Sequence, residues 1–364
     1  MHMSWLRLIV TLGLLSWAAP LAVQAEAVSS RLLITGFDAS SVAEFEQKGV
    51  VYKERGQPKD IFRILADAGY THVRLRVWVD PTKQGHCGEA EVLALAKRAK
   101  AAGLKILLCF HYSDDWADPK HQALPPAWCA LPADQLNAAL LEHNRRIVAA
   151  LEAQGTPADM AQIGNEINHG MLWPAGRNND AAGWDKLAEL LKSAVKGIRQ
   201  GEAQPGRMPI MIHIAGGSVD FFQQLEKRQV PYDIVGLSYY PQWHGSPAEF
   251  SGVLNDHARR LKKPVMMVET SYPWTKARPP GASSVPADTK LPPASLRLQA
   301  EFLAQVVRVV KAVPDGRGAG VFYWGGERTD GYGNQALFDF QGNALATLPV
   351  LATGVIPKEL PADQ

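Results

Sequence analysis

The chain has 364 residues, and its formal net charge of +2 leaves acidic and basic side chains nearly balanced. Because the sequence contains no block or stripe of Lys and Arg, nucleic acids and anionic surfaces are poor candidates for its partner. A neutral ligand is the better match, and ten Trp and nine Tyr residues supply flat apolar rings for binding one.

The N-terminus has the pattern of a targeting segment. Arg7 precedes an almost wholly apolar run at residues 8–21, and small residues around Ala25 suit cleavage by signal peptidase. We therefore predict a signal peptide at residues 1–25 and a periplasmic or secreted protein, with an uncleaved N-terminal anchor as the alternative. The apolar run is too short to span a bilayer comfortably and no comparable stretch follows, so we expect no membrane association.

Residues 26–364 are predicted to form one domain in which strands and helices alternate. Strand-length apolar runs occur at residues 32–38, 72–78, 105–111, 160–164, 209–214, 233–240, 264–269 and 318–324. Helical spacing of apolar residues occurs between them, at residues 61–68, 91–102, 136–154, 184–200, 250–261 and 296–313. Eight such units predict an α/β fold of the (β/α)8 TIM-barrel type, a single catalytic domain. An open doubly wound sheet is the competing fold, but the Gly-rich phosphate turn expected after an early strand is missing.

A stretch at residues 279–293 is rich in Pro, Ala and Ser. It falls between the seventh strand and the next helix, so we expect a loop over the active face.

Polar and aromatic side chains gather at the C-terminal ends of the predicted strands, which form the working face of such a barrel. In chain order they are Asp38, Arg74, Arg76, Trp78, His111, Asp114, Asp115, Trp116, Asn165, Glu166, His213, Tyr239, Tyr240, Trp243, His244, Glu269, Tyr272, Trp274 and Trp324. The opposite strand ends carry no comparable set. Carboxylates flanked by indole and phenol rings are typical of a glycosidase cleft, because the rings stack on the apolar faces of sugars.

Glu166 and Glu269 each end an apolar run, where an ionised carboxylate is costly without a partner or a polar cleft. A cap or surface position is the ordinary interpretation of one such Glu, but two of them favour a catalytic pair. If the two carboxyl groups face each other across the barrel mouth at about 5 to 5.5 Å, hydrolysis would retain the configuration of the sugar. Glu166 would then be the acid/base and Glu269 the nucleophile, with Arg74 and a tyrosine hydroxyl favouring the ionised form of Glu269.

Several residues carry alternatives. His213 is expected in the cleft rather than the core, whereas His111 suits either place. Trp184 and Phe221 are expected to pack between helices rather than to contact a ligand. The aspartates at 114, 115 and 118 either bind a cation or, by preference, cap and order their own loop. No zinc-type Cys or His spacing occurs, so neither a metal nor a cofactor is expected.

Three cysteines are present. Cys109 lies inside an apolar run, whereas Cys87 and Cys129 lie in predicted loops. A disulfide between these two is possible in an oxidising compartment, and the sequence leaves this open.

Six ordered motifs between residues 34 and 348 resemble glycoside hydrolase family 53, the arabinogalactan endo-β-1,4-galactanases. They are RLRVW at 74–78, HYSDDWADP at 111–119, GNEIN at 164–168, GMLWP at 170–174, SYYP at 238–241 and VET at 268–270. The resemblance implies a barrel that cleaves internal β-1,4-galactosidic bonds with retention, with Glu166 as acid/base and Glu269 as nucleophile. It also implies substrate contacts from Arg74 and Asn165, the latter to the sugar 2-hydroxyl, and from the aromatic residues Trp78, Trp116, Tyr240, Trp243 and Trp324.

One departure concerns the loop after the eighth strand. Some bacterial members of the family carry a long calcium-binding loop there, whereas here Trp324 is followed closely by Asp330 and Asp339. Calcium needs six to eight oxygen ligands, and this loop is too short to supply them. We also expect a monomer. The rival functions are a non-catalytic carbohydrate-binding barrel and a hydrolase of another β-glycan such as mannan or xylan.

Overall fold

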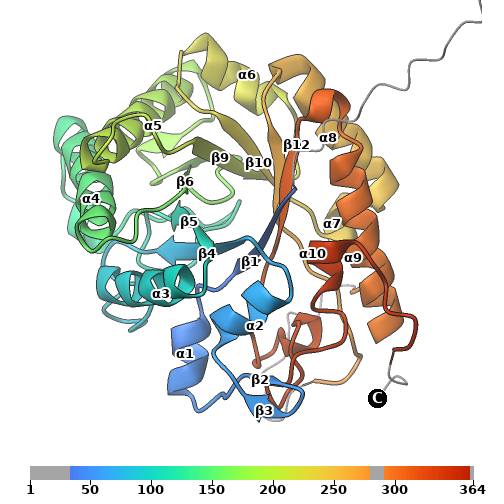
Figure 1. Ribbon diagram of the computed structural model, residues 1–364. Coiled ribbons are helices and arrows are strands. Elements are labelled where there is room, and N and C mark those ends of the chain that lie inside the picture. The colour runs from blue at the N-terminus through green and yellow to red at the C-terminus, as the bar shows by residue number, and fades with distance from the viewer. Residues whose placement is uncertain (1–32, 279–290, 361–364) are drawn as a thin grey trace, which may run out of the picture. The chain divides into compact units, whose positions relative to one another are not determined.

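The computed structural model describes residues 33–278 and 291–360. Within them, eight parallel strands close into a barrel in the order β1-β12-β11-β10-β9-β6-β5-β4 (Figure 1). The barrel strands are β1 (Ile34–Asp38), β4 (His72–Val77), β5 (Lys105–Phe110), β6 (Met160–Ile163), β9 (Ile210–Ala215), β10 (Ile234–Ser238), β11 (Val265–Glu269) and β12 (Gly318–Tyr323). All eight predicted strands and the barrel fold are confirmed. The open-sheet alternative is excluded because β1 pairs with both β4 and β12.

Helices surround the barrel (Figure 1). Those that the periodicity predicts are α2 (Ile61–Asp67), α3 (Glu89–Ala101), α4 (Ala133–Ala153), α5 (Ala181–Gly201), α8 (Pro247–Leu261) and α9 (Leu296–Lys311). Helix α8 begins a turn before its predicted start, because Ser246 and Glu249 form a capping box ahead of the first apolar residue.

Short elements have no counterpart among the predictions. They are helices α1 (Val42–Gln47), α6 (Asp220–Lys227), α7 (Pro241–His244) and α10 (Val350–Thr353), the 3-10 turns at 126–128, 314–316 and 333–335, and the hairpins β2–β3 (Lys53–Glu54, Gln57–Pro58) and β7–β8 (Gly170–Met171, Gly176–Arg177). Most of these segments contain too few residues to establish a helical or strand period. Helix α6 is the exception, because its eight residues exceed the seven of the predicted α2.

The barrel interior is apolar near the N-terminal ends of the strands. Met160, Met211, Met266 and Phe322 form one buried cluster there, separate from the larger core between strands and helices. Gly36 on β1 makes room for Phe322, because a Cβ at that position would lie 2.1 Å from the phenyl ring. The barrel is therefore a packed core at this end and not a pore.

An irregularity in β11 sets the direction of Glu269. The pairing of β10 with β11 runs regularly to Leu237↔Met267 and then skips Val268, so that Ser238 pairs with Glu269. An extra residue in a strand turns the following side chain to the other face, and such bulges often adjoin active sites. Val268 belongs to the interior cluster, and the Glu269 carboxylate meets the buried Arg74 beside it. Two consecutive side chains of β11 thus face inward.

The three cysteines are free: Cys87 and Cys109 are buried and Cys129 is exposed. The disulfide between Cys87 and Cys129 is not formed. Instead, the Arg76 guanidinium donates a hydrogen bond to the Cys87 sulfur at 3.1 Å.

None of the described helices is long and apolar enough to cross a membrane. The predicted signal peptide, residues 1–25, and positions 279–290 of the predicted loop lie outside the described residues.

Candidate active site

Both candidate carboxylates line a single hollow of about 370 Å³ at the C-terminal ends of the strands. Its walls are formed by His111, Trp116, Ala117, Asp118, Asn165, Glu166, Tyr240, Gln242, Trp243, Glu269, Ser271, Trp324, Arg328, Tyr332 and Gln335. These residues come from the end of β11 and from the segments that follow β5, β6, β10, β11 and β12. We refer to this hollow as the cleft.

Arg74 holds Glu269 from below. Its Nη1 lies 2.8 Å from Glu269 Oε1 and 2.6 Å from Asp38 Oδ2, and the guanidinium is only 1% exposed. On the other side, the Tyr240 hydroxyl donates to Glu269 Oε2 at 3.0 Å. Burial raises the pKa of Glu269, while the charge of Arg74 opposes that rise. Each oxygen of this carboxylate is thus oriented, and its negative charge has a buried partner.

Glu166 has different surroundings. It follows Gly164 and Asn165 after β6 and has a positive φ of 49°, a conformation that non-glycine residues rarely adopt. The Ser238 hydroxyl donates to its Oε1 at 2.6 Å. Burial and the nearby charge of Glu269 raise the pKa of Glu166 to about 8. With a cation at Glu269 and only a hydroxyl at Glu166, Glu269 ionises first and Glu166 keeps its proton at neutral pH.

A buried hydrogen-bond network fixes the residues between Glu166 and Glu269. Asn165 Oδ1 accepts from Arg74 Nη2 at 2.6 Å and lies 3.0 Å from His213 Nδ1, while Asn165 Nδ2 donates to the Ala117 carbonyl at 2.8 Å. His213 Nε2 lies 2.8 Å from Ser238 Oγ. The network therefore links Arg74 under the nucleophile candidate to Ser238 at the acid candidate, and every member is buried.

Aromatic rings form the opposite part of the cleft wall. Trp116, Trp324 and Tyr332 follow one another with centroid separations of 6.1 and 5.8 Å, and the Arg328 guanidinium lies between 5.3 and 5.6 Å from all three rings. Trp243 is 62% exposed, which leaves its indole open to a ligand. Flat rings with polar edges suit the apolar faces of sugars.

The residues predicted for the site fall into two groups. Those on the cleft wall are His111, Trp116, Asn165, Glu166, Tyr240, Trp243, Glu269 and Trp324. Those behind it are Asp38, Arg74, Trp78, Asp114, His213 and His244, none of which lines the cleft.

All of the second group except Asp114 hold the first in place, either directly or, for Asp38, through Arg74. Trp78 is buried against Trp116, and the Arg76 guanidinium lies over both rings. His244 Nδ1 accepts from the backbone N–H of Tyr240, and Asp114 accepts from that of Asp80.

His111 is buried and lines the cleft, and neither of its ring nitrogens has a hydrogen-bond partner. Burial, with Arg76 and Arg74 nearby, holds its pKa well below the ordinary value, so the ring is neutral. A neutral imidazole offers one donor and one acceptor to a ligand.

Sequence reasoning missed several residues that line the cleft or contact its carboxylates. Ser238 is two positions before Tyr240 in the SYYP motif, so period-two spacing on this strand could have revealed that both face the same side. Arg328, Tyr332 and Gln335 lie on an irregular loop after β12, where no periodic pattern points to a shared wall.

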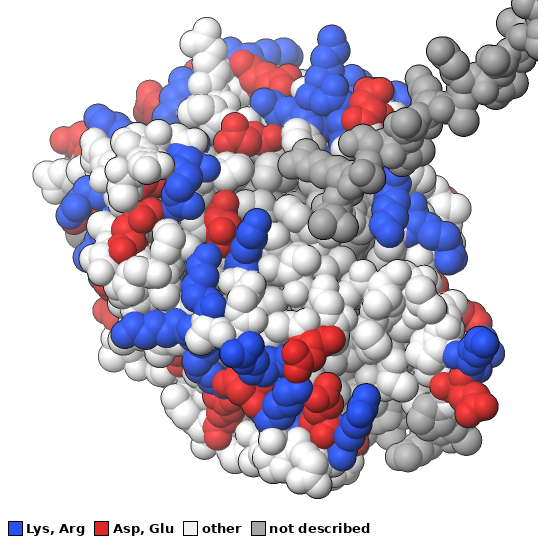
Figure 2. Space-filling view, viewed as in Figure 1, with Lys and Arg blue, Asp and Glu red and all other residues white. Residues whose placement is uncertain are grey.

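No group of three or more His, Cys, Asp or Glu residues suited to a metal ion occurs among the described residues. In the loop after β12, Asp330 forms an ion pair with Arg328, and Asp339 accepts hydrogen bonds from its own loop. Charges on the face seen in Figure 2 are mixed, with Lys and Arg next to Asp and Glu and uncharged residues between them. This distribution agrees with a neutral ligand.

Comparison with known proteins identifies the family. The model described as Glycosyl hydrolase family 53 matches residues 34–351. An arabinogalactan endo-beta-1,4-galactanase of Thermothelomyces thermophilus is 35% identical and covers 88% of this chain and 98% of its own length. One of Cellvibrio japonicus is also 35% identical and covers 79% of each chain. The solved catalytic domain of a GH53 protein of Ignisphaera aggregans superposes with a TM-score of 0.82 at 32% identity, over 90% of this chain and 97% of that one. The chain therefore belongs to glycosyl hydrolase family 53.

Proposed function

We propose that this protein is a retaining endo-β-1,4-galactanase that hydrolyses internal β-1,4-galactosidic bonds of galactan and arabinogalactan. The substrate class is supported by the relatives of Thermothelomyces thermophilus and Cellvibrio japonicus, which are both arabinogalactan endo-beta-1,4-galactanases. The single observation that carries the mechanism is the unequal support of two carboxylates in one cleft: Arg74 and Tyr240 on Glu269, and Ser238 alone on Glu166. Such a pair divides into a nucleophile and an acid.

In the first step, Glu269 attacks the anomeric carbon and Glu166 transfers its proton to the oxygen of the departing sugar. The carbon–oxygen bond breaks as a bond from the carbon to Glu269 forms, so the leaving chain departs as an alcohol. Tyr240 and Arg74 orient the attacking carboxylate, and Asn165, fixed by Arg74 and Ala117, would hold the sugar 2-hydroxyl.

In the second step, Glu166 acts as a base. Now ionised, it removes a proton from a water molecule, whose oxygen attacks the anomeric carbon and displaces Glu269. Two inversions at the same carbon give net retention. Both groups return to their starting protonation states, so no cofactor is needed.

Ser238 and Tyr240 support this geometry. They are two residues apart at the end of β10 and donate to Glu166 and Glu269, respectively. The charge of Glu269 also raises the pKa of Glu166, so the two carboxylates lie close enough to interact. A short separation of this kind is what retention requires.

We further propose that the protein acts as a monomer in the periplasm or outside the cell, after cleavage near Ala25. The segment that suggests export is the apolar run after Arg7. N-terminal sequencing of the mature protein from a culture fraction tests the cleavage position. Size exclusion with light scattering tests the monomer.

The test of the function is product analysis on unbranched β-1,4-galactan beside mannan and xylan, with the anomer of the first product followed by NMR. We expect rapid loss of galactan chain length, a β-configured first product, and no comparable release from mannan or xylan. Preference for mannan or xylan would support the rival glycan assignment. Binding of galactan without any release of reducing ends would support the non-catalytic barrel.

A further inference from the structure

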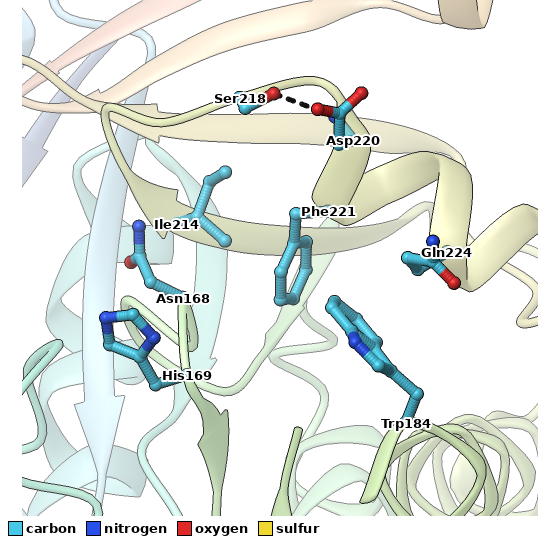
Figure 3. Close-up of a pocket in the computed structure, with 8 residues that line it drawn as sticks. All are labelled: Asn168, His169, Trp184, Ile214, Ser218, Asp220, Phe221 and Gln224. Carbon is cyan, nitrogen blue, oxygen red and sulfur yellow. Dashed lines mark hydrogen bonds between the residues drawn. The ribbon is translucent and has the colours of Figure 1, made fainter. Parts of the chain in front are cut away.

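A second hollow, of about 390 Å³, lies on the same face of the barrel as the cleft. It is lined by Asn168, His169, Trp184, Ile214, Ser218, Asp220, Phe221 and Gln224 (Figure 3). These residues lie at or after the C-terminal ends of β6 and β9 or in the N-terminal parts of α5 and α6, all at the working face. None of them lines the cleft. We call this hollow the β6–β9 pocket.

The pocket has an aromatic wall. The rings of Trp184 and Phe221 lie 5.2 Å apart at 59°, and Figure 3 shows them side by side, with Asn168 and His169 across from them. Sequence reasoning predicted that both rings would pack between helices. They do pack on each other, but Trp184 also remains partly exposed and both rings face the pocket.

Polar groups surround these rings. The Asn168 side chain is held by the backbone of Ala215, donating at 2.9 Å and accepting at 2.8 Å. Ser218 Oγ accepts from the backbone N–H of Asp220, so its own hydroxyl proton can still be donated to a ligand. Apolar rings with amides and hydroxyls at their edges are the chemistry of a sugar-binding site. The carboxylate of Asp220 lies 3.5 Å from Arg260, which offsets its charge.

The pocket and the acid candidate Glu166 are on the same short segment of chain. Asn168 is two residues after Glu166, and the intervening Ile167 donates its N–H to the His213 carbonyl at 3.0 Å. The loop after β9 also packs against the cleft: a Cβ on Gly216 would lie 2.8 Å from the His244 ring, and His244 adjoins Trp243. A single loop segment therefore separates the pocket from the cleft.

The direction of the substrate follows from the chemistry. A catalytic acid protonates the oxygen of the leaving sugar, so the departing part of the chain extends on the side of Glu166. The aromatic wall of Trp116, Trp324 and Tyr332 comes from the loops after β5 and β12, whereas the β6–β9 pocket lies beside the loop of the acid itself.

We propose that the β6–β9 pocket binds galactosyl residues of the departing part of the galactan chain, with Trp184 as the stacking platform. This inference rests on the proposed function and extends it, because it assigns a site for leaving-group residues beyond the bond that is cleaved. Long chains reach this pocket, whereas a substrate with a small leaving group does not.

The experiment compares Trp184→Ala with Trp184→Phe on two substrates, β-1,4-galactan and an aryl β-galactobioside whose leaving group ends inside the cleft. We expect Trp184→Ala to raise KM for galactan about threefold to tenfold, the loss of roughly one ring contact, with kcat nearly unchanged. The aryl substrate should be cleaved at the wild-type rate. Trp184→Phe, which keeps an aromatic face, should restore most of the affinity for galactan.

Two further variants guard against a folding defect. Ser218→Trp places a large ring in the pocket from an exposed position and should raise KM for galactan to a similar extent. Val51→Ala removes part of an exposed apolar side chain in a different hollow and should change neither substrate. Melting temperatures confirm that all four variants are folded.

Unchanged KM for galactan in both Trp184→Ala and Ser218→Trp would overturn the assignment of the pocket and leave the proposed function intact. Equal losses on galactan and the aryl substrate would also overturn it, because they would indicate a disturbed catalytic loop. A wild-type protein that does not cleave galactan would instead refute the proposed function, and the pocket assignment with it.

Discussion

The two ends of the barrel interior contain opposite kinds of side chain, although the same strands supply both. On β6, Met160 lies in the apolar cluster and Gln162, two residues later, bonds to Arg74. On β9, Met211 lies in that cluster and His213 bonds to Asn165. On each of these strands, the next inward-facing side chain, two residues further on, therefore forms hydrogen bonds instead of apolar contacts. The N-terminal half supplies stability and the C-terminal half supplies the chemistry.

The largest expected effect comes from the polar half. Glu269→Ala should lower kcat by at least about four orders of magnitude on every substrate, because in the proposed mechanism this carboxylate alone forms the bond to the anomeric carbon. Steady-state rates with galactan and the aryl substrate measure this. Glu269→Gln is the matched control for the side-chain volume and should be equally inactive. Near wild-type turnover in either variant would remove Glu269 from the mechanism.

Glu166→Ala should cost less and should depend on the leaving group. We expect a loss of about 10²- to 10⁴-fold on galactan, whose departing alcohol needs a proton. Bond cleavage in an aryl substrate with an acidic phenol should be much less affected, since that phenolate departs unprotonated. Burst kinetics on the aryl substrate separate bond cleavage from the later attack of water. Equal losses in bond cleavage for both leaving groups would contradict the role of Glu166 as acid.

A substitution in the apolar half should lower the stability of the protein and leave its activity nearly unchanged. Met266 lies three residues before Glu269 on the same strand and belongs to the interior cluster. Met266→Ala should lower the free energy of unfolding by about 3 kcal/mol, because it leaves a cavity in a packed interior. Denaturant unfolding checks the stability, and kcat at 25 °C should stay close to that of the wild type. A tenfold loss of kcat in the folded variant would show that the two halves are not separable.

The smallest effect concerns pH. Glu166 must carry its proton to act as acid, and its pKa is raised to about 8, so kcat/KM should fall as the pH rises through that region. The hydrogen bond from Ser238 favours the ionised form of Glu166 and lowers this pKa. Ser238→Ala should therefore move the alkaline limb of the pH profile to higher pH. A limb that stays in place or moves to lower pH would mean that another group controls it.

The sequence predicted the barrel because its eight strands are continuous apolar runs and the segments between them have helical spacing of apolar residues. It also predicted Glu166 and Glu269 as site residues, since charged residues at the ends of buried strands need a functional or structural reason. Arg74 was predicted from its period-two spacing with Arg76 and Trp78. The bulge at Val268 could not be foreseen, because it depends on how β11 pairs with β10.

Other residues of the cleft and of the β6–β9 pocket could not be predicted for different reasons. Arg328 and Tyr332 come from an irregular loop, and loops carry no periodic signal. Trp184 and Phe221 lie among helical apolar residues, so their exposure to a pocket became visible only when α5 and α6 were placed beside each other.

In the proposed mechanism, Glu269 bonds to the sugar during turnover. The most direct measurement is mass spectrometry of the enzyme after reaction with a 2-deoxy-2-fluorogalactoside that carries an activated leaving group, followed by peptide mapping. The mechanism predicts one fluorosugar per chain, attached to Glu269. Inactivation with the label on Glu166 or on any other residue would contradict it.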